Sequence, residues 1–201
     1  EGHVPRSNSF GAAFRVTTFG ESHGGGLGVI VDGCPAGHPF PFARIAAQLA
    51  RRRPGQSKLT SPRQEADELK VLSGLEPGTD LTLGTPIAML FANSDARGHH
   101  YDDLAELYRP SHADYTYDAR YGLRAVAGGG RSSARETVAR VAAGALAEDL
   151  LAALHGVEIV AWVAEVADVI APLPDLATLD RTLVDASPVR CPDPASAQAM
   201  I

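Results

Sequence analysis

The sequence predicts a protein of the α+β class, because it combines several short strand-like runs with two helical segments. Four runs are rich in β-branched, aromatic or other apolar residues and are bounded by turn signals, at residues 14–18, 27–31, 68–72 and 87–92. The helical segments are at residues 42–53 and 134–155. The chain has 201 residues, which is enough for a sizeable core in one or two domains.

The two helical segments differ in character. Residues 42–53 have one apolar face, as expected of a helix that packs on a core. Residues 134–155 are rich in alanine and apolar on several faces, so we expect this helix to be buried. Ser133 precedes Glu136 by three residues, which is the spacing of a capping box, and Gly156 is expected to end the helix.

Other segments give weaker signals. Residues 54–64 predict an exposed loop, and residues 93–121, which are polar and rich in aromatic residues, are expected to be mostly irregular. The glycines at 128–130 predict a flexible hinge. Residues 157–169 predict a strand pair or one long strand, and residues 176–183 a short helix.

The two ends of the chain differ from a typical domain. A last helix starts at Pro194, and the chain stops inside it. We therefore expect residues 1–201 to be one domain truncated at its C-terminus, with residues 1–6 resembling a leader or tag.

Composition excludes several classes of protein. Hydrophobic residues make up 45% of the chain, which argues against a wholly disordered protein. No apolar run approaches the roughly 18 residues that a membrane-spanning helix needs, so we expect no membrane partner. The two cysteines, Cys34 and Cys191, cannot form a disulfide framework, and a reducing cytoplasm is the simplest compartment.

Charge argues for a small anionic ligand. The formal net charge is −6, yet basic residues cluster locally at residues 51–63 and 109–140. A protein that binds DNA or RNA usually presents a strongly basic domain, so we expect no nucleic-acid partner. Local cationic clusters on a mildly acidic chain fit a small polyanion better.

Two stretches in the first third of the chain have residues suited to chemistry. Residues 20–26, Gly-Glu-Ser-His-Gly-Gly-Gly, place the Ser22 hydroxyl and the His23 imidazole in a glycine-rich turn, where backbone N–H groups can approach an anion. A plain glycine turn with a surface histidine is the structural alternative. Residues 51–58 contain three arginines and Lys58, which suit phosphate or carboxylate groups. A solvated helix end is the alternative here.

Two further stretches lie in the middle of the chain. Residues 108–117, which include Arg109 and His112, combine charged groups with three tyrosines, as functional loops often do. A loop whose aromatic residues pin it to the core is an equal alternative. Residues 128–137 place glycines and hydroxyls before a helix start, a pattern competent to bind an anion, and Arg131 and Arg135 add full charges.

These stretches together predict a cationic, glycine-lined pocket with two imidazoles. Such a site suits an anionic substrate, such as a phosphate ester, with general acid assistance. We predict no metal site, because His99-His100 and Asp102-Asp103 are adjacent pairs that point different ways and have no third ligand at helpful spacing.

At these same motifs the sequence resembles the chorismate synthase family. Residues 14–24 and 31–35 resemble the family's N-terminal signature, and residues 51–55, 109–116 and 128–137 match further blocks in the same order. The resemblance runs from about Ser7 to the end of the chain. It implies elimination of phosphate from 5-enolpyruvylshikimate 3-phosphate to give chorismate, a 1,4-anti elimination without net redox change that nevertheless needs reduced FMN.

The resemblance assigns roles to individual residues. His23 would protonate the departing phosphate, which lowers the charge that must develop on the leaving oxygen. His112 matches the histidine near the flavin that keeps reduced FMN suitably protonated. The cofactor-binding residues implied are Arg131, Ser132 and Ser133. The residues implied at anionic substrate groups are Ser22, Arg52, Lys58, Arg109 and Arg135.

The resemblance also implies an architecture and an assembly. The family fold is a β-α-β sandwich with core helices between antiparallel sheets, assembled as a homotetramer in the cytoplasm. NADPH serves as flavin reductant in some relatives. Lys58 stands where many relatives have arginine, and Ser111 where glycine is common. The family continues well beyond residue 201, so we expect this chain by itself to be inactive or poorly folded.

Three rival functions remain at this point. A truncated or degenerate relative could hold a flavin or an anion without performing the elimination. A phosphatase or phosphotransferase could use the same cationic pocket, although it would usually need a P-loop or a Mg²⁺-binding carboxylate set. RNA binding is opposed by the acidic balance of the chain.

Overall fold

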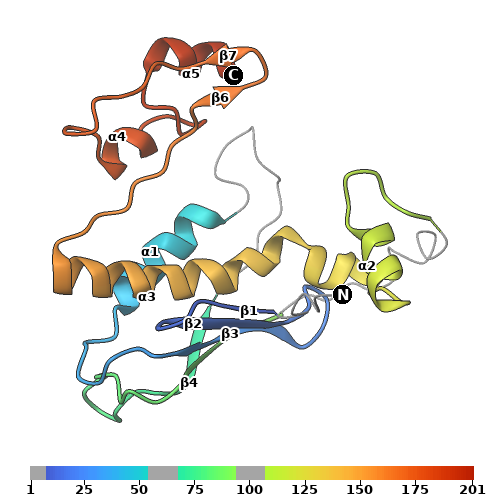
Figure 1. Ribbon diagram of the computed structural model, residues 1–201, viewed down its shortest axis with the longest axis vertical. Helices are drawn as coiled ribbons and strands as arrows, with labels where there is room; N and C mark the ends of the chain where they lie inside the picture. Colours follow the sequence, from blue (N-terminus) through green and yellow to red (C-terminus); the bar gives the residue numbers. More distant parts are fainter. Residues whose placement is uncertain (1–7, 54–67, 94–106) are drawn as a thin grey trace.

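The computed structural model describes residues 8–53, 68–93 and 107–201 (Figure 1). An antiparallel sheet of five strands forms one layer, in the order β1-β2-β3-β5-β4. Its strands are β1 Ser9–Phe10, β2 Arg15–Gly20, β3 Gly26–Asp32, β4 Leu69–Ser73 and β5 Ile87–Ala92. Helices α1 Phe42–Arg52 and α3 Thr137–His155 lie on one face of this sheet. The α+β class is therefore confirmed, and the four strands predicted from the sequence are present.

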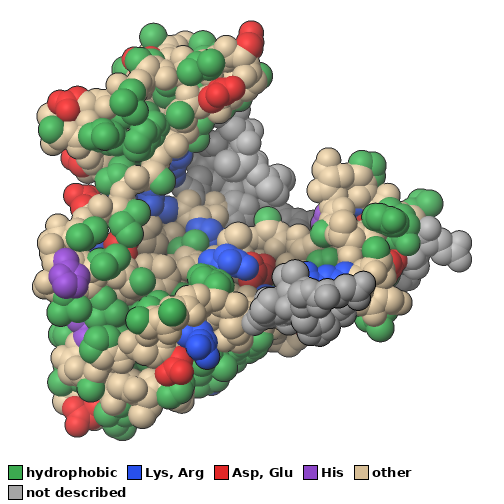
Figure 2. Space-filling view, viewed as in Figure 1, with side chains coloured by type: hydrophobic (Ala, Val, Ile, Leu, Met, Phe, Trp, Pro, Cys, Tyr) green, Lys and Arg blue, Asp and Glu red, His purple; other side chains and the backbone are tan. Residues whose placement is uncertain are grey.

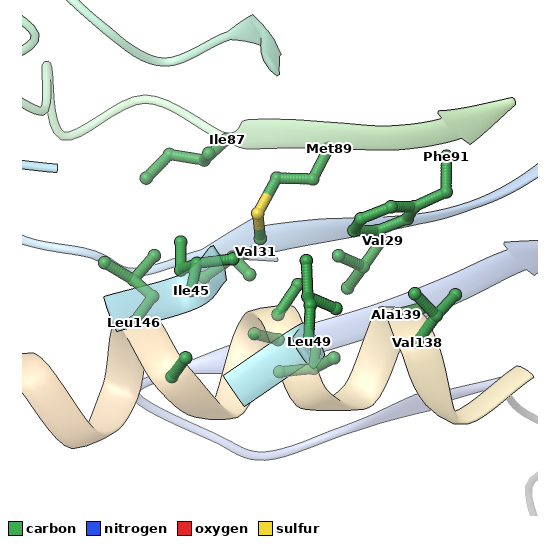
Figure 3. Packing of buried hydrophobic residues seen from close by; sticks show 14 of the residues in the cluster. Val29, Val31, Ile45, Leu49, Ile87, Met89, Phe91, Val138, Ala139 and Leu146 are labelled. Atoms are coloured by element: carbon green, nitrogen blue, oxygen red, sulfur yellow. The ribbon is translucent and has the colours of Figure 1, made fainter. Parts of the chain in front are cut away.

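The core lies between the sheet and these two helices. Alternate residues of β3 point to the same face, and Leu27, Val29 and Val31 are all fully buried there. Their partners on β5 are Phe91, Met89 and Ile87, which are equally buried. Helical residues close the cluster from the other side, among them Ile45, Leu49, Val138, Ala139 and Leu146 (Figure 3).

Helix α3 is buried along most of its length, as its alanine-rich sequence predicts. Small side chains let it approach both the sheet and α1 closely, and Val138, Ala142 and Leu146 are completely shielded from water. Gly156 ends the helix in the left-handed conformation, with φ +64°, and its N–H donates to Ala152 O at 3.0 Å. The predicted end of the helix is confirmed.

The expectation of a mostly irregular segment over residues 93–121 is wrong in its last part. Asp114–Tyr121 forms helix α2, with Asp114 in the first turn and Arg120 in the last. Both charges suit the helix dipole. Gly122 ends the helix with φ +75° and donates its N–H to Asp118 O at 2.8 Å. This C-terminal glycine signal was present in the sequence.

The predictions for the C-terminal segment are wrong in detail. Residues 157–164 form no strand, and only the two-residue strands β6 Glu165–Val166 and β7 Val169–Ile170 pair. The short helix α4 covers Arg181–Asp185 instead of residues 176–183, because Asp180 caps it by accepting from Leu183 N at 2.7 Å. Helix α5, Pro194–Met200, starts where the sequence predicts.

The C-terminal segment lies on the side of α1 and α3 away from the sheet (Figure 1). Two ion pairs attach it there. Arg51 of α1 donates twice to Asp185 of α4, at 2.8 and 2.9 Å. Arg181 of α4 donates to the buried carboxylate of Glu148 on α3.

Within the described residues, no helix is both long and apolar enough to cross a membrane.

Candidate active site

The turn between β2 and β3 holds His23. Gly20 begins it with φ +85°, and a Cβ there would lie 2.1 Å from Gly26 O, so only glycine fits. The Ser22 side chain is buried, and its Oγ lies 3.2 Å from His23 Nδ1. The backbone N–H of Ser22 donates to Gly130 O at 3.4 Å. The first and fourth motifs of the sequence are therefore in direct contact.

A 3₁₀ helix over Ala127–Ser132 forms the neighbouring wall. The prediction of a flexible glycine hinge is wrong, because Gly129 and Gly130 are buried in close contact with other residues. A Cβ on Gly129 would lie 2.3 Å from His112 Cε1. Ser132 Oγ donates to Gly129 O at 2.6 Å and lies 3.3 Å from His112 Nδ1. The glycines let the backbone approach the imidazole, and the third motif thus joins the same site.

Arg131 connects this wall to the sheet. Its guanidinium donates to Gly20 O at 3.0 Å and to Thr18 Oγ1 at 2.5 Å. The same group forms an ion pair with Glu136 at 3.0 Å. These contacts fix the strand end from which the His23 turn begins. Arg131, which the resemblance implies as a cofactor-binding residue, thus has a structural role in this site.

The start of α3 differs from the predicted capping box. A 3₁₀ turn over Ala134–Glu136 precedes the helix, and Ser133 Oγ accepts from Arg135 N at 3.3 Å. Glu136 does not complete the box: its carboxylate accepts from Arg131, and from Arg140 at 2.8 Å. The half-buried Ser133 hydroxyl still lies at a helix start beside Arg135, as the sequence predicts.

Asp114 anchors the segment that contains His112. Its carboxylate is 3% exposed and accepts two hydrogen bonds from the Arg109 guanidinium, both at 2.7 Å, and one from Arg109 N at 3.0 Å. Arg124 Nη1 lies at 3.5 Å and His112 Nδ1 at 3.6 Å. The hydrogen bonds from Arg109 hold the pKa of the Asp114 carboxyl well below its usual range, against the opposing effect of burial. The carboxylate therefore remains charged and fixes its basic neighbours.

Asn93 is a functional candidate that the sequence analysis missed. It follows β5, and its side-chain amide donates to Glu21 O at 3.0 Å and to Gly24 O at 2.7 Å. Its amide oxygen accepts from the buried Arg135 guanidinium. No spacing rule singles out one asparagine at the end of a strand, so only the three-dimensional arrangement identifies it.

The arginines at the end of α1 have separate partners. Arg52 Nε donates to Thr137 Oγ1 at 3.4 Å, which places it beside the first residue of α3, two positions after Arg135. Arg51 points instead to Asp185. Figure 2 shows basic side chains along the middle of this face of the molecule. Lys58 and the pairs at 99–100 and 102–103 lie outside the described residues.

The geometry therefore brings most of the predicted site residues into one region. They are Ser22, His23, His112, Arg131, Ser132, Ser133 and Arg135, with Arg52 at the border. Arg109 is directed to Asp114 through the Nε–Nη2 edge of its guanidinium. Two imidazoles, three hydroxyls and several buried or partly buried guanidinium groups can hold a phosphorylated anion and deliver a proton to it. In the part of the chain that the structure describes, no three His, Cys, Asp or Glu side chains are grouped as metal ligands.

Known proteins are similar to this chain in sequence and in fold. The family model described as chorismate synthase matches residues 14–201. Curated chorismate synthases from Cyanothece sp. and Synechocystis sp. are 55% and 56% identical to the chain, each over 96% of it and 53% of their own length. A crystal structure of a chorismate synthase matches 94% of this chain and 51% of its own, with a TM-score of 0.64 and 27% identity.

The similarity thus extends over nearly all of this chain, which itself spans about half the length of the curated relatives it matches. The family match includes every motif that forms the site, from the His23 turn to the start of α3. The agreement of sequence and fold over that whole length leaves a single assignment: the chain belongs to the chorismate synthase family.

Proposed function

We propose that this chain provides the His23 side of an active site that eliminates phosphate from 5-enolpyruvylshikimate 3-phosphate to give chorismate. One observation carries the proposal. The His23 turn lies against the segment that contains Ser132 and Arg135. Ser22 N donates to Gly130 O, and Asn93 donates to Gly24 O while it accepts from Arg135. Ser132 in turn contacts His112. Such convergence of acid, hydroxyl and guanidinium groups suits a phosphate leaving group.

In this reaction His23 donates its proton to the phosphate oxygen as the carbon–oxygen bond breaks. Without this proton, the phosphate oxygen would leave with more negative charge. The phosphate charge is held by Arg135 and Arg52, with Lys58 and the Ser22 hydroxyl as further contacts. Arg109, fixed by Asp114, adds positive potential to the same wall.

Reduced FMN fits the residues on the His112 side. The half-buried hydroxyls of Ser132 and Ser133 lie next to Arg131 and Arg135, a donor set suited to an anionic cofactor. When held by these residues, reduced flavin would supply the electron density that assists loss of phosphate. His112, held on its Nδ1 side by Ser132, keeps a proton near the cofactor.

Other properties follow from the family resemblance. We propose a homotetramer in the cytoplasm that acts on a small phosphorylated molecule and has no nucleic-acid partner. NADPH is the proposed reductant of the flavin.

An anaerobic assay tests this function. The protein that carries this chain is mixed with the substrate and reduced FMN, and chorismate absorbance and released phosphate are followed together. His23→Ala is expected to lower kcat by about 10²- to 10⁴-fold, because it removes the general acid. His155→Ala is the matched control, since His155 is exposed at the far end of α3.

Other outcomes contradict the proposal. FMN binding without product would indicate a flavin-binding relative that performs no elimination. Phosphate release that does not depend on flavin would indicate a phosphatase instead. An unchanged kcat in His23→Ala would remove His23 from the role of acid.

A further inference from the structure

Asn93 holds both ends of the segment that contains His23. Its side-chain NH₂ donates to Glu21 O at 3.0 Å and to Gly24 O at 2.7 Å. Its backbone N–H donates to Gly25 O at 3.4 Å. A bond from Gly24 N to Glu21 O, at 3.2 Å, closes the turn on itself. One residue of the strand end therefore fixes the carbonyl groups on either side of the imidazole.

The other half of the same amide faces Arg135. The guanidinium donates through Nη1 to Asn93 Oδ1 and through Nη2 to Ala92 O at 3.5 Å. The partners define the orientation of the amide, because two carbonyl oxygens require the NH₂ group and a guanidinium requires the oxygen. Aspartate has the same shape but cannot donate, and alanine can do neither. An amide of this length is needed for both tasks.

We propose that Asn93 is a positioning residue that sets His23 and Arg135 at a fixed separation. The proposal rests on the proposed function, in which His23 protonates the phosphate whose charge Arg135 holds. Both groups must reach one leaving group at the same moment, so their relative placement determines the rate. A single amide hydrogen-bonded to both parts is a direct means of holding that placement.

Hydrogen–deuterium exchange tests the structural half of this proposal without reference to activity. In Asn93→Ala and Asn93→Asp we expect amide exchange of residues 20–26 to rise about tenfold or more, because two hydrogen bonds to the turn are lost. Asn93→Asp retains an acceptor for Arg135, so it keeps the fold if alanine does not. Ser73→Ala is the control, since it removes two hydrogen bonds at the opposite end of β5, to Pro86 O and from Ala88 N. Exchange equal to wild type in Asn93→Asp would overturn the proposal.

Kinetics tests the functional half. Asn93→Asp is expected to lower kcat by about 10- to 100-fold with a smaller change in KM, because a misplaced acid impairs the chemical step more than binding. A variant with faster exchange but wild-type kcat would overturn the positioning role. A wild-type protein that produces no chorismate would instead refute the proposed function, while the exchange data would still report whether Asn93 fixes the turn.

Discussion

At the scale of single residues, Asp114 shows how one buried charge organises a loop. Three basic side chains, Arg109, Arg124 and His112, face its carboxylate from different positions along the chain. A buried carboxylate is costly unless it is paired and hydrogen-bonded. Here the bidentate contact with Arg109 meets that requirement, and the two nearby basic groups reinforce it. Loss of the charge would leave three partly buried basic groups without their shared partner.

Asp114→Asn is therefore expected to lower the free energy of unfolding by about 3 kcal/mol at neutral pH. The folded-state pKa of Asp114 is depressed, so its stabilisation is complete above the ordinary carboxyl pKa of 3.8 and is lost as the pH falls below that value. The difference between wild type and variant should shrink in acid. Denaturant unfolding at pH 7 and at pH 3 measures it, with the exposed Asp168→Asn as control. Equal stability at pH 7 would contradict this account.

The titratable residues of the site could be predicted from the sequence, whereas Asn93, which positions the His23 turn by hydrogen bonds, could not. His23 stands out because an imidazole lies in a glycine-rich turn, and His112 because charged groups and three tyrosines are dense around it. Asn93 does not stand out, because its role depends on carbonyl groups of residues 21 and 24 that are distant in sequence. Contacts between backbone oxygens and a lone amide leave no periodic pattern that sequence reasoning can detect.

At the scale of elements, prediction succeeded where burial imposes a pattern. The short apolar run at residues 27–31 predicts β3, and the alanine-rich run predicts α3. It failed over residues 157–164, where Val157, Ile159 and Val160 have strand-forming side chains but form no strand. A strand requires a partner strand, and residue preferences alone do not supply one.

The 3₁₀ helix that contains Gly129 gives a prediction at this scale. Gly129→Ala is expected to destabilise the protein by about 2–4 kcal/mol, because the new Cβ meets His112 Cε1 at 2.3 Å in addition to the left-handed backbone strain. Gly37→Ala is a matched control, with φ +80° but no atom near its Cβ. It should cost only about 1–2 kcal/mol. Thermal unfolding measures the loss of stability in each variant, and the NMR resonances of the His112 imidazole report the contact with the new Cβ.

We expect the new Cβ in Gly129→Ala to displace the His112 ring, and this displacement separates the steric contact from general backbone strain. We expect the imidazole resonances of His112 to shift in Gly129→Ala and to stay in place in Gly37→Ala. Equal destabilisation by both substitutions, with an unmoved ring, would show that Gly129 is needed for its backbone conformation alone.

At the scale of the whole molecule, side-chain ion pairs attach the C-terminal segment to the helical layer. Arg51 of α1 binds Asp185, which also pairs with Arg190 of the segment itself, and both guanidinium groups lower the pKa of its carboxyl. Each of these side chains is about one-third exposed, so water and salt weaken the pairs. The attachment is therefore looser than the sheet–helix core.

Asp185→Asn should loosen this segment selectively, while the pair between Arg181 and Glu148 remains. We expect amide exchange over residues 181–190 to rise about three- to fivefold while the sheet is unaffected, since a partly exposed pair contributes about 0.5–1 kcal/mol. Because the folded pKa of Asp185 is depressed, acid below the ordinary carboxyl value of 3.8 should have the same effect on wild type. Simultaneous loosening of α3 would contradict separate attachment.

The strand order has a consequence for how the chain assembles during synthesis. β2 and β3 are neighbours in sequence and pair at once, but the other edge of β3 receives β5, with Gly26 opposite Ala92 and Val31 opposite Ile87. Closing so long a loop is slow compared with local hairpin formation. On the ribosome, the backbone N–H and C=O groups along this edge of β3 therefore stay unpaired until residue 92 has emerged, and during that interval the edge is open to pairing with other chains.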